Sequence, residues 1–501
     1  MIVRLLTASA LALGLAAAPL AAQAQAPADA FASDVNQVVR IKQGALKGTV
    51  KDGVAYTLGI PYAAPPVGDL RWKPPAPAPA WAGERDASRA GPRCQDVEDC
   101  LTLNVVRPAN AKPGQKLPVM VWIHGGAFVI GTSMGAFGGD TEGTNFAKDG
   151  IVHVSLNYRL GRAGWFAHPA LTGEGPTGNY GLMDQVAALK WVQANIARFG
   201  GDPKNVTIYG ESAGGISVLY LMLAPDAKGL FAKAIGQSSF ARHQPTPLKT
   251  AEAAGLKAAQ AAGVQGEDAA AAAALRKLPL SAMPYTGGFI GRAGPILDGR
   301  YITTGIAQGF AAGRQAKIPL MLGGNSNEAS LVRPQPAQLD AIPELQKAAI
   351  LKTFDPANSG DKARIVNDVV TVQMITEPDR HAARLHTKAG HPAFLYYFSH
   401  VPADAGARKP YGAGHTDEIR YVFGAPTAPA KFTADDKALS DAIHGYWVNF
   451  ARTGAPGTAG GVAWPRFGAN EAQVEFRQGA VSVRERFLKD WRDAVEAGQS
   501  K

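Results

Sequence analysis

The segment GESAG at residues 210–214 constrains the fold more than any other part of the chain. It follows a short, β-rich apolar run at residues 206–209 and precedes a run of helical character. In that context the pattern G-x-S-x-G predicts a sharp strand-to-helix turn, which projects Ser212 from the carboxyl edge of a sheet. Gly210 and Gly214 leave room for neighbouring backbone, and the start of the following helix favours an anion beside the serine. The segment therefore makes Ser212 a candidate nucleophile.

Strands and helices alternate through the middle of the chain. Short runs rich in β-branched and aromatic residues predict strands, and apolar residues at helical spacing predict a helix over 183–199 and helices within the Ala-rich stretch 251–274. Besides 206–209, the predicted strands are Leu117–Ile123, 151–156, 318–322 and Ala393–Phe398. This alternation predicts an α/β fold with a mostly parallel central sheet and helices on both faces. In such folds, active-site groups lie at the carboxyl ends of the strands.

A glycine-rich turn follows the predicted strand Leu117–Ile123. Its sequence, HGGAF at residues 124–128, resembles the HGGG-type loop whose backbone N–H groups stabilise an oxyanion. An unspecialised glycine-rich turn is the alternative. The position after a strand favours the first interpretation, because the loop would then lie at the same edge of the sheet as the serine.

Together with five longer segments, these motifs resemble the type-B carboxylesterase family, which also contains the cholinesterases. The five are GIPYAAPPVGDLRW at 59–72, EDCLTLNV at 98–105, the run from 178 to 215, YWVNFARTGAPG at 446–457 and WPRF at 464–467. They extend over most of the chain. The resemblance implies an α/β-hydrolase fold and a serine carboxylic ester hydrolase, which needs no metal and no cofactor.

The resemblance also implies an acid and a base. The acid is expected in a segment like G-x-N-x-x-E-G, and residues 323–329 supply Glu328, with Ala329 in place of the usual final glycine. The base is expected in a segment like G-x-x-H-x-x-E-I-x-Y-V-F-G, which residues 412–424 match with His415. The chain order of serine, acid and base is that of α/β-hydrolases.

The oxyanion-stabilising N–H groups are implied by the same resemblance to be those of Gly126, Ala127 and Ala213. Ala127 replaces a common third glycine, which keeps the N–H group but narrows the floor of the oxyanion hole. His124 lies in this loop and competes with His415 as the base. A structural or pocket-wall role is the expected one for His124.

Three further polar residues are expected to support the fold rather than the chemistry. His444 falls on a run of helical character and is interpreted as a packing histidine. Arg159 and Asp184 fall in segments that resemble the family's motifs, and they are interpreted as members of a structural ion pair.

Cys94 and Cys100 are the two cysteines of the chain. An oxidising compartment would favour a disulfide between them, with two free thiols as the alternative, and their spacing matches no zinc or thioredoxin site. In the resembling family, the cysteine of the EDC motif usually pairs with one far upstream. The long loop between them forms part of the wall of a deep gorge, and in cholinesterases it carries a tryptophan that binds choline.

The corresponding loop here is short, because only QDVED separates the cysteines, without an aromatic residue. We therefore expect an open active-site entrance, poor preference for choline esters and tolerance of broad or bulky ester substrates. The stretch 326–343 could instead fold over the entrance and replace the missing wall.

Residues 1–24 have the pattern of a signal peptide. Arg4 precedes an apolar run that begins at Leu5, and Ala22-Gln23-Ala24 fits a small-residue cleavage site. We expect cleavage near Ala24, a single α/β-hydrolase domain over 25–501, and a secreted or bacterial periplasmic protein. A retained N-terminal anchor is the alternative, but Pro19 and the small residues make this run a poor one.

The sequence also bears on partners and on other functions. The net charge of +10 is spread along the chain without a nucleic-acid motif, and no later stretch offers about twenty apolar residues. We expect a small-molecule ester as the partner, no nucleic acid and no membrane span, while the oligomeric state stays open. The rivals are a catalytically inactive binding or adhesion protein, which usually lacks the serine or the histidine, and an amidase or lactonase with the same triad.

Overall fold

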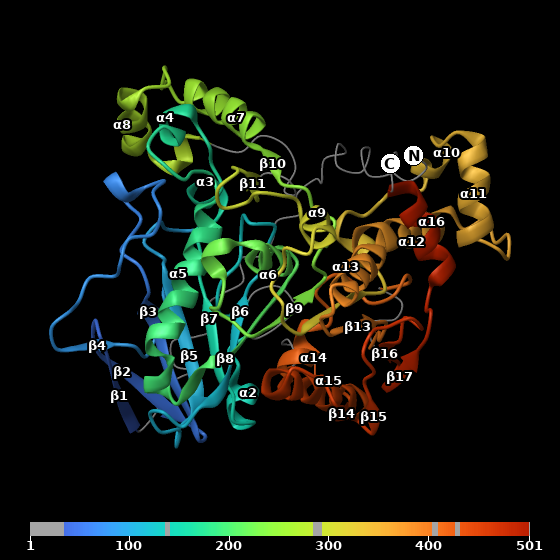
Figure 1. Ribbon diagram of the computed structural model, residues 1–501, viewed down its shortest axis with the longest axis horizontal. Coiled ribbons are helices and arrows are strands. Elements are labelled where there is room, and N and C mark those ends of the chain that lie inside the picture. The colour runs from blue at the N-terminus through green and yellow to red at the C-terminus, as the bar shows by residue number, and fades with distance from the viewer. Residues whose placement is uncertain (1–34, 136–140, 284–292, 403–408, 426–430, 500–501) are drawn as a thin grey trace.

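The computed structural model describes residues 35–135, 141–283, 293–402, 409–425 and 431–499, so the predicted signal peptide lies outside the described residues (Figure 1). Within them, the centre is a 13-stranded sheet. Its parallel part contains β6 (Leu117–Ile123), β7 (Val152–Leu156), β8 (Gly201–Glu211), β9 (Lys233–Gln237), β12 (Leu320–Asn325), β13 (Ala393–Phe398) and β16 (Gln473–Arg477). These strands lie in the spatial order β7-β6-β8-β9-β12-β13-β16.

Antiparallel strands extend the sheet at both edges. One edge carries β1 (Val35–Ile41), β2 (Gly44–Lys51), β3 (Val54–Pro61) and β5 (Thr102–Pro108), with β4 (Glu84–Asp86) beside β2; the other carries β17 (Ala480–Arg484). Two small pairs lie apart, β10 (Thr246–Pro247) with β11 (Ile296–Leu297) and β14 (Thr458–Ala459) with β15 (Val462–Ala463).

Helices cover both faces of the sheet. The longer ones are α5 (Tyr180–Asn195), α6 (Ala213–Leu223), α7 (Leu248–Ala261), α8 (Ala269–Lys277), α11 (Glu344–Phe354), α12 (Lys362–Thr371), α13 (Glu377–Lys388), α15 (Ala434–Thr453) and α16 (Lys489–Gln499). Shorter ones are α2 (Thr144–Lys148), α3 (Gly161–Gly164), α4 (Pro169–Thr172), α9 (Ile306–Ala311), α10 (Ala337–Asp340) and α14 (Ile419–Phe423).

The alternation of side chains along β6 explains the two layers of helices. Val119 and Val121 belong to the same buried cluster as the apolar residues of α5 and α6. Met120 and Trp122 point the other way and pack in a second cluster with α14 and α15. Because successive residues of a strand face opposite sides, a strand that is apolar throughout must be covered on both. The predicted fold class is thereby confirmed.

Most of the predicted elements are found, with shifted ends. Leu117–Ile123 and Ala393–Phe398 coincide with β6 and β13, and 151–156 corresponds to β7. The run 206–209 is the inner part of the longer β8, and α5 continues into a 3₁₀ turn that ends at Phe199. The strand predicted at 318–322 begins later, at Leu320, because Pro319 has no N–H group to give to the ladder.

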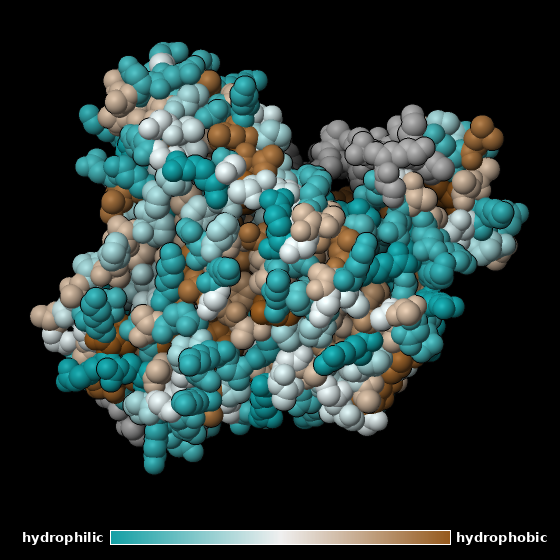
Figure 2. Space-filling model, in the orientation of Figure 1, coloured by the Kyte–Doolittle hydropathy of each residue, from teal (hydrophilic) through white to brown (hydrophobic). Residues whose placement is uncertain are grey.

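Figure 1 places α7 and α8 at one end of the molecule and α10 and α11 at another, with the sheet between them. On the face shown in Figure 2 polar side chains predominate, with apolar side chains scattered among them. Among the described helices, none combines the length and the hydrophobicity that a bilayer crossing requires.

Candidate active site

Ser212 lies in the turn between β8 and α6, with φ of 57° and ψ of −120°. The turn is closely packed against the end of β6. A Cβ atom at Gly210 would lie 2.6 Å from the carbonyl oxygen of Ile123, and one at Gly214 would lie 2.0 Å from the same oxygen. Both positions therefore require glycine. The Ser212 N–H donates to Gln237 O at 3.0 Å, which fixes the turn to the end of β9.

Residues 124–131, called the oxyanion loop below, follow β6 and lie against this turn. A Cβ atom at Gly125 would come within 3.1 Å of Ser212 Cβ. Gly126, Ala127 and Phe128 all have positive φ, of 103°, 52° and 61°. Two of these residues are not glycine, which is a strained backbone of the kind found at functional sites.

The strained loop leaves backbone amides without acceptors. Within the residues that the structure describes, the N–H groups of Gly126, Ala127 and Ala213 donate no hydrogen bond. Ala213 is the first residue of α6, where helix geometry also leaves N–H groups unused. These N–H groups are therefore available to a ligand; Ala213 directly follows Ser212, and Gly125, the neighbour of Gly126, lies against Ser212.

His415 and Glu328 are directly paired. The Nδ1 atom of His415 lies 2.6 Å from Glu328 Oε2, and both side chains are buried. Glu328 Oε1 accepts two further hydrogen bonds at 2.6 Å, from Ser238 Oγ and from the N–H of Asn325. The backbone N–H of His415 donates to Ser330 Oγ at 2.9 Å. These contacts hold the Glu328 carboxylate against the His415 imidazole and anchor the backbone of His415.

Ser212 and His415 share no hydrogen bond among the described residues. The Nε2 atom of His415 instead lies 3.1 Å from Oε1 of Glu211, the residue before Ser212. The sequence motifs include Glu211, but its role beside the imidazole was not predicted. The signal was its position: a residue that directly precedes the serine of the turn must lie close to whatever approaches that serine.

A second carboxylate that was not predicted, that of Glu418, lies near His415 and Glu211. Its carboxylate accepts from Gln237 Nε2 at 2.9 Å and from Asn325 Nδ2 at 2.6 Å. Burial raises the pKa of Glu418 to about 7, and the charge of Glu328 pushes it in the same direction. The matched segment 412–424 contains this residue, so its proximity to His415 follows from the chain, although its burial could not be read from the sequence.

The buried carboxylates also set the charge of the imidazole. Burial alone would lower the pKa of His415, but Glu211 and Glu328 outweigh it and raise that pKa to about 10. Burial raises the pKa of Glu211 well above its usual range, with His415 opposing the rise. Because Glu211 is itself driven towards its neutral form, Glu328 is the more dependable source of the raised pKa of His415.

The other two histidines considered lie outside this pairing. His124 stacks on Tyr158 at 4.5 Å between ring centroids, its Nδ1 lies 2.8 Å from Gly125 O, and burial lowers its pKa to about 4. A largely neutral, stacked imidazole is suited to supporting the loop. His444 lies on α15 and contacts Val422 O and Asp149 through its two nitrogens, as a packing histidine would.

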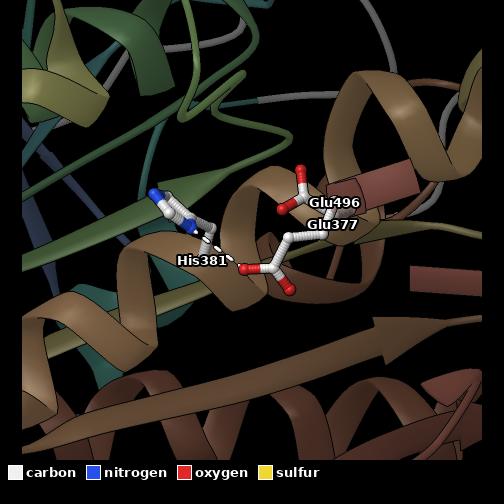
Figure 3. Close-up of side chains that lie close together, drawn as sticks. All are labelled: Glu377, His381 and Glu496. Carbon is white, nitrogen blue, oxygen red and sulfur yellow. Dashed lines mark ion pairs between the residues drawn. The ribbon is translucent and has the colours of Figure 1, made fainter. Parts of the chain in front are cut away.

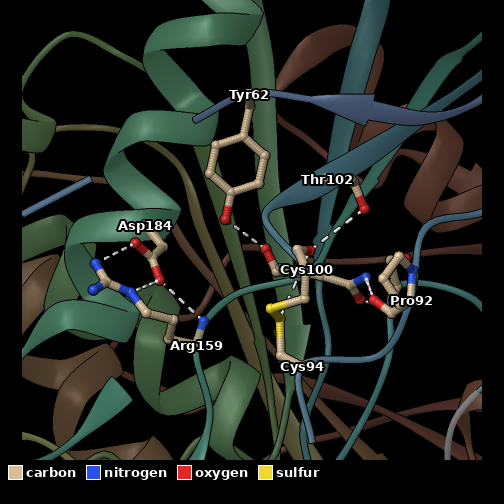
Figure 4. The surroundings of a disulfide bond; sticks show 9 residues. Tyr62, Pro92, Cys94, Cys100, Thr102, Arg159 and Asp184 are labelled. Atoms are coloured by element: carbon tan, nitrogen blue, oxygen red, sulfur yellow. Dashed lines mark hydrogen bonds and ion pairs between the residues drawn. A yellow bond between two sulfur atoms is a disulfide. The ribbon is translucent and has the colours of Figure 1, made fainter. Parts of the chain in front are cut away.

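Arg159 and Asp184 form a buried, two-pronged ion pair, with Nη2–Oδ1 at 2.7 Å and Nε–Oδ2 at 2.8 Å (Figure 4). The Arg159 N–H also donates to Asp184. The ion pair ties the segment after β7 to α5, which is a structural role.

Cys94 and Cys100 are joined in a disulfide, with Cα atoms 5.1 Å apart.

One other group of side chains has the residue types of a metal site. Ligand atoms of Glu377, His381 and Glu496 lie within 4.8 Å of one another (Figure 3). Arg242 already forms a two-pronged pair with Glu377, and Arg380 donates to Glu496 at 2.7 Å. These cations supply the charge that a metal ion would bring, so the group is an ion-pair network between α13 and α16.

The sequence profile of the carboxylesterase family matches residues 35–347 and 336–486. This chain belongs to the carboxylesterase family. It is 36% identical to the fumonisin B1 esterase of Sphingopyxis macrogoltabida, over 91% of this chain and 87% of that protein. It is 35% identical to the para-nitrobenzyl esterase of Bacillus subtilis, over 86% and 93% of the two chains. The crystal structure of a carboxylesterase from Geobacillus stearothermophilus has a TM-score of 0.77 and 30% identity, covering 91% of this chain and 99% of that one.

These relatives confirm that the chain has an α/β-hydrolase fold. They also confirm its class of activity, which is that of a carboxylic ester hydrolase. The family match covers both the GESAG turn and the segment around His415.

The electrostatics of the site predict how His415 titrates. Glu328→Gln and Glu211→Gln each remove a negative charge that favours the imidazolium, so both should lower the pKa of His415, with the larger shift for Glu328→Gln. NMR titration of the His415 ring measures this. Asp441→Asn, an exposed residue paired with Lys437, is the control and should leave the titration unchanged. A His415 titration that neither active-site variant moves would contradict the electrostatic account.

Proposed function

We propose that this carboxylesterase hydrolyses esters through an acyl-enzyme on Ser212, with His415 as the base and Glu328 as the acid. The observation that carries the proposal is the grouping at the carboxyl ends of β6, β8 and β12. There a strained serine turn, free backbone amides and a buried His–Glu pair meet. A serine hydrolase needs all three: a nucleophile, donors for the oxyanion, and a base with its acidic partner.

In the proposed reaction, His415 Nε2 accepts the proton of Ser212 Oγ as the oxygen attacks the ester carbonyl. The N–H groups of Gly126, Ala127 and Ala213 stabilise the oxyanion, each worth about 3 kcal/mol. His415 then gives the proton to the departing alkoxide, and a water molecule, activated in the same way, releases the carboxylic acid. Catalytic hydrogen bonds are often long without substrate, and His415 Nε2 turns from Glu211 to Ser212 in this scheme.

Glu211 has a supporting part in this proposal. Only a neutral imidazole can accept the serine proton, yet the surrounding carboxylates favour the imidazolium form of His415. Burial raises the pKa of Glu211 well above its usual range, and its Oε1 lies 3.1 Å from His415 Nε2. Glu211 can therefore hold the extra proton while His415 is neutral.

Substitutions of the triad test this assignment. Ser212→Ala should lower kcat by at least about 10³-fold, because the nucleophile is lost while the remaining hole still binds substrate. His415→Ala should have a similar effect, and Glu328→Gln a smaller one, since the acid orients and stabilises but moves no proton. Steady-state kinetics on an activated ester measures kcat, and circular dichroism checks that each variant is folded. A folded Ser212→Ala protein with near-wild-type kcat would rule out the proposed nucleophile.

We further propose an open entrance and broad ester substrates. The Cys94–Cys100 loop is too short to form a gorge wall and carries no aromatic residue. The stretch 326–343, which could have replaced that wall, buries Leu339 and Ile342 in a cluster with α11 and α12. The names of the two bacterial relatives, which refer to fumonisin B1 and to a para-nitrobenzyl ester, also support large substrates.

A panel of esters tests the entrance. Without an aromatic partner a choline head loses a contact worth about 2 kcal/mol, so kcat/KM for a choline ester should not exceed that for an uncharged ester of equal size. A para-nitrobenzyl ester should be hydrolysed at least as well as the small ester. The matched amide of the small ester serves to separate esterase from amidase activity. A clear preference for choline, or a steep loss with bulk, would show a closed entrance.

We also propose that residues 1–24 are removed on export to the periplasm or the medium, and that residues 25–501 form one domain. The leader pattern and the disulfide between Cys94 and Cys100 support this, since disulfides persist in oxidising compartments.

Mass spectrometry of the unreduced protein, recovered from outside the cytoplasm of an expressing bacterium, tests export. The expected result is an N-terminus near residue 25 and a peptide in which Cys94 and Cys100 are joined by an internal disulfide. An intact Met1 in the recovered protein, or two thiols that alkylate without reduction, would contradict the respective parts of the proposal.

A further inference from the structure

The backbone N–H of Gly131, at the end of the oxyanion loop, is bound by a side chain from a distant part of the chain. This N–H donates to Oε1 of Gln95 at 2.9 Å, across 36 positions of the chain. Gly131 is buried, whereas Gln95 is an exposed residue of the short loop between the two cysteines. A buried backbone N–H group needs an acceptor, so this side chain satisfies a requirement of the oxyanion loop itself.

Gly131 in turn supports the residues that lie beside Ser212. A Cβ atom at Gly131 would lie 2.3 Å from His124 Nδ1 and 2.6 Å from Gly125 O, so its backbone packs directly against both. Gly125 lies against Ser212, as described above. A displacement of Gly131 would therefore be transmitted to His124 and Gly125, and through Gly125 to the part of the loop that lies against the serine.

The disulfide fixes the position of Gln95. Cys94, the residue before Gln95, is bonded to Cys100, which lies just before β5, a strand inside the main sheet (Figure 4). A second tie runs through Asn157, whose side chain donates to Pro92 O at 3.0 Å and accepts from the Ser133 N–H at 2.8 Å. The cysteine loop is thus fastened to the sheet on one side and to the end of the oxyanion loop on the other.

From these contacts we propose that Gln95 is a positioning residue for the oxyanion hole, and that the Cys94–Cys100 disulfide is required to hold it there. The inference rests on the proposed function of the oxyanion loop. Backbone donors lower an activation barrier only when they are already aimed at the oxyanion. Release of Gly131 would let the amides of Gly126 and Ala127 lose that aim, which costs transition-state stabilisation and leaves binding of the neutral ester nearly unchanged.

The test compares single variants with a matched control on the same loop. Gln95→Ala removes the acceptor, Gln95→Glu keeps an acceptor oxygen, and the paired change Cys94→Ser with Cys100→Ser removes the disulfide. Val97→Ala is the control, because Val97 lies in the same loop with 44% of its surface exposed. For each variant, kcat and KM are measured separately on an uncharged ester, and thermal unfolding checks the fold.

The expected result is a fall in kcat of about tenfold for Gln95→Ala and for the cysteine variant, smaller than the loss of a whole donor because the amides remain present. KM should stay within about twofold of the wild type, and Gln95→Glu and Val97→Ala should keep wild-type kcat. A Gln95→Ala enzyme with wild-type kcat, or one whose only defect is a raised KM, overturns the role of Gln95. A cysteine variant with wild-type kcat overturns the role of the disulfide.

The failure of this inference can be told apart from failure of the proposed function. If Ser212→Ala is inactive and Gln95→Ala is fully active, the catalytic assignment stands and the positioning role is wrong. If Ser212→Ala is itself active, the proposed nucleophile is wrong, whatever Gln95 does.

Discussion

The site depends on how closely the end of β6 approaches the turn after β8. The carbonyl of Ile123 occupies the space that a side chain would need at Gly210 or Gly214, so only glycine allows the two strand ends to meet. That approach holds Ser212 in a left-handed conformation and seats the oxyanion loop against it. The position of Ser212 and that of the oxyanion loop are thus linked by close packing of backbone against backbone.

The second constraint is electrostatic. Glu211, Glu328 and Glu418 are all buried near the imidazole of His415, where burial opposes the charge of each group. Glu328 accepts three hydrogen bonds and Glu418 two, whereas the Glu211 carboxylate, among the described residues, accepts none and lies 3.1 Å from the imidazole. Glu211 is therefore the least compensated of the three for the burial of its carboxylate.

The sequence predicts the parts of this arrangement that depend on local geometry. The turn around Ser212 follows from two glycines between a strand and a helix, and β6 and β13 follow from uninterrupted apolar runs. The pairing of Glu328 with His415 could be expected only from the resemblance to a family, because nothing local in either segment indicates that they meet. The position of Glu211 directly before Ser212 indicates that it lies near the serine, but not that its carboxylate contacts the imidazole, and nothing in the sequence indicates the contact of Gln95 with Gly131. Both contacts depend on side-chain directions that are set only once distant segments have packed.

The strand order of the sheet has a consequence for the enzyme during its synthesis. The serine turn directly follows β8, but Glu328 follows β12, which pairs with β9 on one side and β13 on the other, and His415 comes later still, before α14. A chain that emerges from its N-terminus contains Ser212 long before it contains His415. If His415 is the base, as proposed, a chain that ends before this residue carries the serine without the group that takes its proton, and hydrolysis requires contacts that only the later segments make.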